Sequence, residues 1–282
     1  MPTLPQAYPD VFQGYPGVGY PNSIAELKKI QLRGPHYNFL RKLAHRDVVF
    51  LFDDFLGKAI DSTLNWSGAT GGGAASVTPT IFLGPSGLLR TTTGTANGVT
   101  ASGSVIGPII YPGTMNPGME IRFRGVTAVT GLKVEAGFID AVPAANAGGI
   151  NNMDTPTAAM ANGALVGIDT TATANLFNLV TIGSATNQAI KKTNGTTGMA
   201  AALTYQTLRV QLFSRDATTA NAVDVAAWHN GQRIATHDIS ATAGVGAVNG
   251  SVLLAPWFYV RAMDATSKSI DIDYIALWAD RQ

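Results

Sequence analysis

The feature that most constrains this chain is an alternation of apolar and polar side chains that begins near residue 47 and recurs to the C-terminus. It is clearest in residues 119–124 (MEIRFR), 132–138 (LKVEAGF) and 208–212 (LRVQL). A period of two places alternate side chains on opposite faces of a β-strand, so each segment is predicted to be a strand with one buried face. Further strands are expected at 48–52, 88–93, 99–110, 164–169, 176–182, 223–229, 232–239, 252–262 and 268–279.

Clusters of Gly, Asn, Pro and Thr separate these predicted strands, which is typical of antiparallel strands joined by turns. No helix of normal length is indicated after residue 47, which argues against a parallel α/β sheet. Hydrophobic residues make up 46% of the chain, enough for a sizeable core. We therefore predict that residues 47–282 form an all-β, antiparallel two-sheet β-sandwich, with loops at 141–163 and 184–200.

One hairpin is predicted in detail at residues 230–231, Asn-Gly. Both residues tolerate a positive φ, so the pair suits a type I′ turn between two strands. With these as the central turn residues, Trp228 faces Arg233 and Asp224 faces His237. A carboxylate beside an imidazole is a favourable cross-strand pair, so we interpret His237 as structural and not catalytic.

The N-terminal segment, residues 1–46, differs from the rest of the chain. Five prolines in residues 1–22 favour an extended arm, and helical spacing predicts short helices near 23–34 and 37–43. Such elements need a surface to lie on, so we predict an assembly or docking segment. Its candidate partner-binding residues are aromatic or apolar: Tyr8, Phe12, Tyr15, Tyr20, Leu27 and Ile30.

The composition restricts the partners. Charged residues are only 13% of the chain, against roughly 25% in an average protein, and the net charge is +1. No basic field is available for nucleic acid or an anionic membrane, and no apolar run is long enough to span a bilayer. A weakly charged surface suits a protein that is packed against neighbours.

Cofactor and metal sites are not indicated. The four histidines have no ligand spacing, there is no cysteine, and no nucleotide-binding glycine motif is present. Asp53, Asp54, Asp271 and Asp273 would form a calcium site if the first and last strands were neighbours. The alternative, which we favour, is that these carboxylates end a strand or face solvent. Apolar residues change faces along the last strand, which implies a bulge near Tyr274.

Glycoside hydrolysis is the main catalytic alternative, because it needs two carboxyl groups beside the scissile bond. Sandwich glycosidases usually carry a dense E-x-D-x-E strand, and this chain has only S-I-D-I-D-Y at 269–274. Glu120 and Glu135 lie in strands with Arg or Lys and are interpreted as outward-facing pairs. We therefore expect no enzyme.

Several motifs in order along the chain carry a family resemblance. They are D-D-F-x-G at 53–57, G-L-L-R-T-T-T-G at 87–94, E-A-G-F-I-D at 135–140, G-A-L-V-G-I-D-T at 163–170 and S-I-D-I-D-Y-I-A-L-W at 269–278. Residues 47–282 thereby resemble the concanavalin A-like (laminin-G/jelly-roll type) sandwiches of tailed-bacteriophage structural proteins. The metal-and-sugar loop of legume lectins is not found, so sugar binding is not implied.

The resemblance implies a structural virion protein, most simply a capsid-associated decoration or auxiliary protein that docks through residues 1–46. Its partners would be other virion proteins and copies of itself, and its location the virion after synthesis in the host cytoplasm. The first alternative is a tail or fibre module that binds host-surface glycans, with Trp257, Phe258 and Tyr259 as candidates, although such a run is commonly core on both faces. The second is a polysaccharide-degrading enzyme.

Overall fold

The computed structural model divides the chain into two units, Met1–Val48 and Val49–Gln282. The predicted arm and helices of residues 1–46, with all six candidate partner-binding residues, lie outside the part that is described. Their docking role stays a prediction. The described residues are 48–56, 67–68, 80–82, 87–93, 102–107, 111–141, 143, 148–183, 190–214, 222–237 and 248–280.

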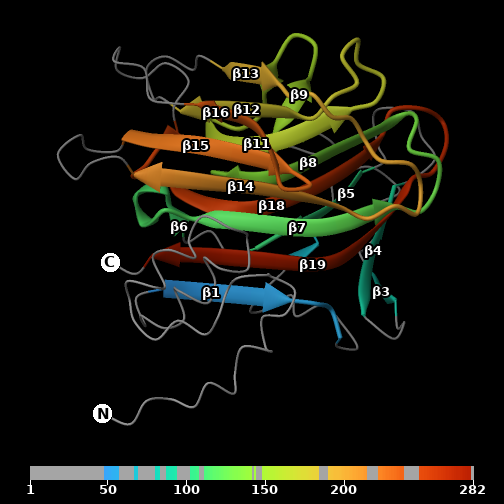
Figure 1. The fold of residues 1–282 in the computed structure, drawn as a ribbon, viewed down its shortest axis with the longest axis horizontal. Helices are drawn as coiled ribbons and strands as arrows, with labels where there is room; N and C mark the ends of the chain where they lie inside the picture. The colour runs from blue at the N-terminus through green and yellow to red at the C-terminus, as the bar shows by residue number, and fades with distance from the viewer. Residues whose placement is uncertain are drawn as a thin grey trace, which may run out of the picture. The chain divides into compact units, whose positions relative to one another are not determined.

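Two large antiparallel sheets make up the second unit and form a sandwich, which confirms the predicted fold class (Figure 1). Sheet A has β1 (Val48–Asp53) beside β19, and β17 (Val248–Asn249) beside β15. Its main strands, in spatial order, are β16 (Gln232–His237), β15 (Ala222–His229), β14 (Gln206–Ser214), β7 (Gly118–Gly125), β19 (Ser269–Asp280), β4 (Leu88–Thr92) and β3 (Thr80–Phe82).

Sheet B lies behind sheet A in the view of Figure 1. A short strand, β6 (Tyr111–Pro112), pairs with β18 and leads into a 3₁₀ turn at Gly113–Met115. The main strands, in spatial order, are β13 (Lys191–Asn194), β12 (Asn178–Gly183), β11 (Asn162–Asp169), β8 (Leu132–Ile139), β18 (Leu253–Ala262), β5 (Ser102–Ile106) and β2 (Ser67–Gly68). A separate two-stranded sheet joins β9 (Ile150–Asn152) to β10 (Thr157–Ala158).

The main hydrophobic core lies between the two sheets, where the apolar side of each alternating strand is buried. Ile121 and Phe123 of β7 and Val134 of β8 are all fully buried there. The Phe123 and Phe258 rings, from opposite sheets, have centroids 5.6 Å apart. The period-two pattern of the sequence therefore produces this core directly.

The predicted hairpin and bulge are both confirmed. Asn230 and Gly231 have φ angles of 49° and 76°, as a type I′ turn requires, and Trp228 faces Arg233. In β19, Asp273 is an extra residue between Ile272 and Tyr274, because their partners on β7 are adjacent in sequence.

The predicted pairing of Asp224 with His237 was wrong. Ile234 is an extra residue in β16, so His237 lies opposite Val225. The shift turns the imidazole inward, where it is fully buried. Its Nδ1 is 2.8 Å from the hydroxyl of Thr181 and its Nε2 is 2.9 Å from that of Thr193.

No helix among the described residues has the length and apolar character needed to cross a bilayer.

Candidate functional site

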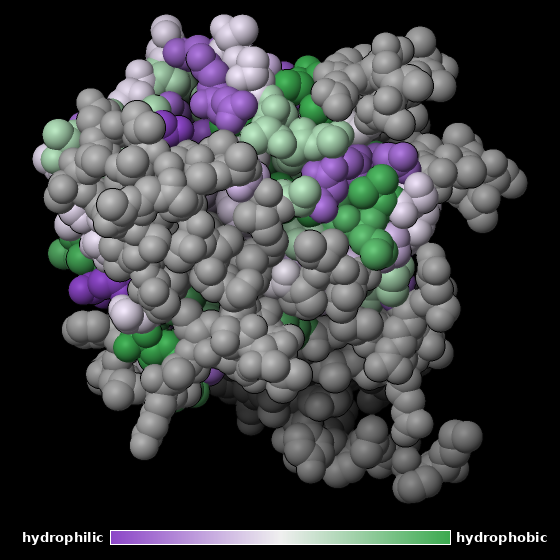
Figure 2. Space-filling model, turned by 180° about the vertical axis from the view of Figure 1, so that it is seen from behind, coloured by the Kyte–Doolittle hydropathy of each residue, from purple (hydrophilic) through white to green (hydrophobic). Residues whose placement is uncertain are grey.

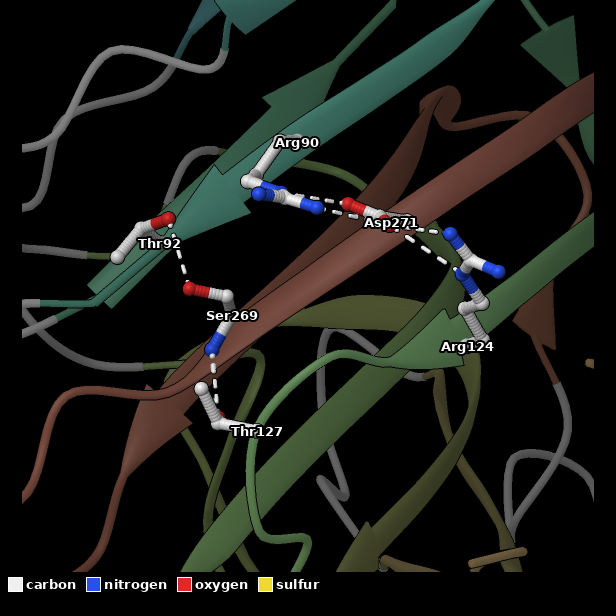
Figure 3. A network of polar contacts seen from close by, with 6 residues as sticks. All are labelled: Arg90, Thr92, Arg124, Thr127, Ser269 and Asp271. Atoms are coloured by element: carbon white, nitrogen blue, oxygen red, sulfur yellow. Dashed lines mark hydrogen bonds and ion pairs between the residues drawn. The ribbon is translucent and has the colours of Figure 1, made fainter. Parts of the chain in front are cut away.

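The outer face of sheet A carries an ion-pair network centred on Asp271 (Figure 3). Arg90 donates from Nε and Nη2 to the carboxylate at 2.7 and 3.1 Å, and this bond raises the pKa of Arg90. Arg124 donates from its Nε and Nη2 at 3.2 and 3.1 Å. Asp273 pairs with Arg122 at 2.6 Å.

Two of the four aspartates considered as calcium ligands, Asp271 and Asp273, are paired with arginines in the structure. Strands β1 and β19 are neighbours, as the calcium hypothesis required. Asp271 is fully buried against two arginines, so the expectation that it faces solvent was wrong. Within the described part of the chain, no group of three or more His, Asp or Glu side chains is arranged to hold a metal ion.

A second cluster on this face stacks an arginine with two tryptophans. The Arg209 guanidinium lies 4.6 Å from the ring centre of Trp228 and 5.3 Å from that of Trp278, and burial lowers its pKa. Glu120 of β7 lies opposite Arg209 of β14. It is buried and accepts a 2.7 Å hydrogen bond from the Tyr274 hydroxyl. Burial and this carboxylate raise the pKa of Tyr274. Glu120 is therefore not an ordinary outward-facing charge.

The outer face of sheet B presents a different set of side chains. Strand β18 contributes Trp257 and Tyr259, whose rings stack at 5.8 Å and 13°. Tyr259 lies opposite Glu135 of β8, and Arg261 lies opposite Lys133. Two aromatic rings therefore adjoin three charged groups across two central strands. This combination of apolar surface and a few polar groups is typical of ligand sites.

Lys133 and Glu135 form a fully buried ion pair on this face, with Nζ and Oε1 2.9 Å apart. The Nζ of Lys133 also lies 5.8 Å from the Tyr259 ring centre, and the Trp257 indole N–H donates to Glu135 at 3.4 Å. An ion pair without water is costly unless further hydrogen bonds satisfy both partners. The earlier interpretation of Glu135 as an ordinary outward pair was wrong, because a further segment covers it.

That segment is residues 148–160, which include β9 and β10 and are called the flap below. Glu135 accepts the backbone N–H groups of Gly149 and Ile150 at 2.7 and 3.2 Å, and Lys133 donates to the carbonyl of Ile150. Apolar flap residues pack on Trp257 and its neighbours as a second hydrophobic cluster. As a result Trp257 and Tyr259 are each only 2% exposed. Part of the segment 141–163, which was predicted to be a loop, thus folds onto the outer face of sheet B.

Two buried polar atoms on this face have no hydrogen-bond partner among the described residues. They are the Nε of Arg261, a donor, and the Oδ1 of Asn178, an acceptor. Asn178 lies opposite Gly167, which in turn lies opposite Glu135. Buried polar groups are nearly always paired, so such atoms call for an explanation by water or ligand. On the side seen in Figure 2, small hydrophobic and hydrophilic patches lie next to one another.

The sequence identified part of this site. The prediction that the run Trp257–Tyr259 is buried on both faces is confirmed, with Phe258 in the main core. Lys133, Glu135 and Asn178 were missed as site residues. The available signal was the polar side of residues 133–137, which carries Lys133, Glu135 and Gly137. In the antiparallel ladder these three residues lie opposite Arg261, Tyr259 and Trp257 of β18. The pairing depends on the strand register, which the sequence alone does not give.

Comparisons with known proteins support the fold. No family model and no curated protein matches the sequence. Among solved structures, a protein reported with the mucin-degrading endo-acting O-glycanases of human gut microbiota has a TM-score of 0.55 at 11% identity, covering 82% of this chain and 99% of its own. SCLam, a non-specific endo-β-1,3(4)-glucanase of family GH16, has 0.54 at 10%, covering 83% and 92%. The Crh5 transglycosylase has 0.50 at 10%, covering 82% and 84%.

These likenesses establish a concanavalin A-like or jelly-roll sandwich and correct one prediction. We expected no enzyme because the dense acidic motif is missing from the sequence. That exclusion was wrong, since a glucanase, a transglycosylase and an O-glycanase-associated protein share the fold over most of the chain. Identities of 10–11% carry the fold alone, so the chemistry has to be argued from this chain's own site.

Proposed function

We propose that the sandwich is a carbohydrate-recognition module, of the kind that a phage tail or fibre protein uses to hold a host-surface glycan. Its site is the outer face of sheet B. The observation that carries the proposal is the stacked pair Trp257 and Tyr259 next to Arg261 of the same strand, whose buried Nε has no partner among the described residues. The unpartnered Oδ1 of Asn178 lies further along the same face, on β12, with β11 and β8 between it and Tyr259. Sugars present flat C–H faces that stack on aromatic rings, and hydroxyl groups that both donate and accept hydrogen bonds.

The solved structures add support from the fold. Proteins of this architecture described as glucanase, transglycosylase and O-glycanase act on carbohydrates, and they match more than four fifths of this chain. The probes therefore follow from them: a mixed-linkage β-1,3(4)-glucan and mucin O-glycans. Release of reducing ends should be measured with binding, since the fold is also that of glycan-cleaving enzymes.

The test is titration calorimetry of the full chain with each probe, followed by Trp257→Ala. Losing one stacked ring should weaken binding about tenfold, from about 1–1.5 kcal/mol of aromatic contact. Trp228→Ala is the matched control, because Trp228 lies on the outer face of sheet A and its removal should leave the affinity unchanged. Equal affinities of the Trp257→Ala variant and the parent chain, or no binding of any glycan in a wider array, would overturn the proposal.

The capsid-decoration role remains a prediction that rests on the sequence resemblance and on the predicted docking segment, residues 1–46. It is compatible with the module proposed here, since a virion protein can dock through one segment and bind a ligand through another. Its test is incorporation: chains lacking residues 1–46 should be left out of particles that take up the full chain.

A further inference from the structure

The cover over the sheet B face is attached differently from the strands around it. Among the described strands, β9 and β10 pair only with each other and have no ladder to either large sheet. A two-stranded unit of this size has little stability of its own. The flap is therefore held down by side chains, and those contacts decide whether it stays closed.

Two of the anchors are ionic and come from the sheet. Lys133 donates to the carbonyl of Ile150, and Glu135 accepts hydrogen bonds from the N–H groups of Gly149 and Ile150. A third anchor is Lys192 of β13, which donates to the carbonyl of Met153. When the flap lifts, water solvates both members of the buried pair, which relieves their desolvation. Opening is consequently less costly than exposing a purely apolar surface of the same size.

The apolar anchors fit into notches that glycines leave. The methyl group of Met153 lies over Gly167, where a Cβ would be 2.2 Å from it. The sulfur of Met160 lies over Gly163 in the same way, with a Cβ at 2.7 Å. Both glycines are on the outer side of β11, so the strand is shaped to receive this flap. A cover built into the sheet in this way has one defined closed position.

We propose that the flap is a gate over the carbohydrate site, which opens to expose Trp257 and Tyr259 and closes through the Lys133–Glu135 clamp. This rests on the proposed function for its ligand, but not for its motion. If a glycan binds only the open form, the measured affinity equals the intrinsic affinity reduced by the open fraction. Loosening the flap then tightens binding, and locking it abolishes binding.

The lock uses two exposed residues, Asp154 of the flap and Thr173 in the loop after β11. The Thr173 amide donates to Asp154 at 3.1 Å and the two side-chain oxygens lie 3.4 Å apart, so the two side chains are in contact and cysteines placed there can be tested as a cross-link. Because the chain has no cysteine, Asp154→Cys with Thr173→Cys gives one bond and no mispairing. Oxidised protein should bind β-1,3(4)-glucan or mucin O-glycans at least tenfold more weakly, and reduction of the same sample should restore binding.

The loosening variant is Met153→Ala, which empties the notch at Gly167 and changes no residue of the sheet face itself. It should speed hydrogen exchange of the Gly149 and Ile150 amides at least tenfold and tighten glycan binding. Thr155→Ala, at an exposed flap position, is the control and should change neither.

The outcomes separate the two proposals. If the flap amides exchange as slowly as those of the central strand β8, the gate proposal is overturned, because the flap would then open only on global unfolding. Undiminished glycan binding by the oxidised lock would overturn it as well. Fast flap exchange with no glycan bound by any variant, Met153→Ala included, would overturn the carbohydrate function and leave the motion standing.

Discussion

The buried imidazole of His237 predicts a loss of stability in mild acid. It joins β16 of sheet A to Thr181 and Thr193 of sheet B, and it is fully buried. Burial, helped by the nearby Lys191, lowers its pKa from 6.5 to about 4. In the unfolded chain the imidazole takes up its proton near pH 6.5. The unfolded state therefore binds more protons between these two values, and stability must fall as the pH falls from 6.5 to 4.

The size of the effect follows from the two pKa values. At pH 7 almost none of this stability is lost, because the imidazole is mostly neutral in both the folded and the unfolded chain. At pH 5 the unfolded imidazole is almost fully protonated and the folded one is almost neutral, which costs about 2 kcal/mol of unfolding free energy. Below pH 4 the loss levels off near 3.4 kcal/mol, because the pKa of the imidazole is 6.5 in the unfolded chain and about 4 in the folded one, and each tenfold change in proton affinity is worth roughly 1.36 kcal/mol. These are upper bounds, since local opening of the edge strand β16 would solvate the ring at lower cost.

The assay is urea unfolding at pH 7, 6, 5 and 4.5, comparing the parent chain with His237→Gln. The amide keeps polar contact with both threonines but does not titrate. The free-energy difference between the two proteins should therefore shrink by about 2 kcal/mol from pH 7 to pH 5. His229→Gln should show a change of the same sign, because burial lowers that pKa too. A difference that stays constant with pH would refute the reasoning.

Two further predictions concern sheet A. Gly118→Ala should destabilise the fold by about 1–3 kcal/mol in thermal unfolding, because its Cβ would lie 2.2 Å from the Trp278 ring; unchanged stability would show that the indole moves aside freely. Asp271→Asn should cost about 2–4 kcal/mol, as two guanidinium groups lose a buried carboxylate, whereas Asp273→Asn, at a more exposed pair, should cost under about 1 kcal/mol; equal costs would contradict this ranking.

Local patterns were sufficient to predict the strands but not every register. Alternation located β7, β8 and β14, and the change of apolar face along β19 located its bulge, because both depend on adjacent residues. The bulge at Ile234 left no such trace. Ile234 is itself apolar and packs against the core, so the run 232–237 is as compatible with an unbroken hairpin as with a bulged one. A one-residue shift then moved His237 to the opposite face.

The covering of the sheet B face could not be read from the sequence for a related reason. Residues 148–160 are mostly small and polar with no period, a pattern that predicts a loop. What makes them fold back is the pair of notches at Gly163 and Gly167, and the charge pair Lys133–Glu135 beneath. A glycine in a strand and a charge on its polar side each have common local explanations. Only the tertiary contacts show that they belong to one structure.

The surface of the folded chain has even fewer charges than its composition indicates. Six charged residues among those described are buried: Glu120, Lys133, Glu135, Asp169, Lys268 and Asp271. A surface with so little charge does little to keep copies apart, which favours association. Copies that dock through residues 1–46 would thus meet little repulsion, so we expect the full chain to be an oligomer in sedimentation experiments. A version starting at Asp47 lacks the docking segment and should be a folded monomer. Monomers in both cases would contradict the docking role of residues 1–46, and an unfolded shorter chain would show that this segment belongs to the core.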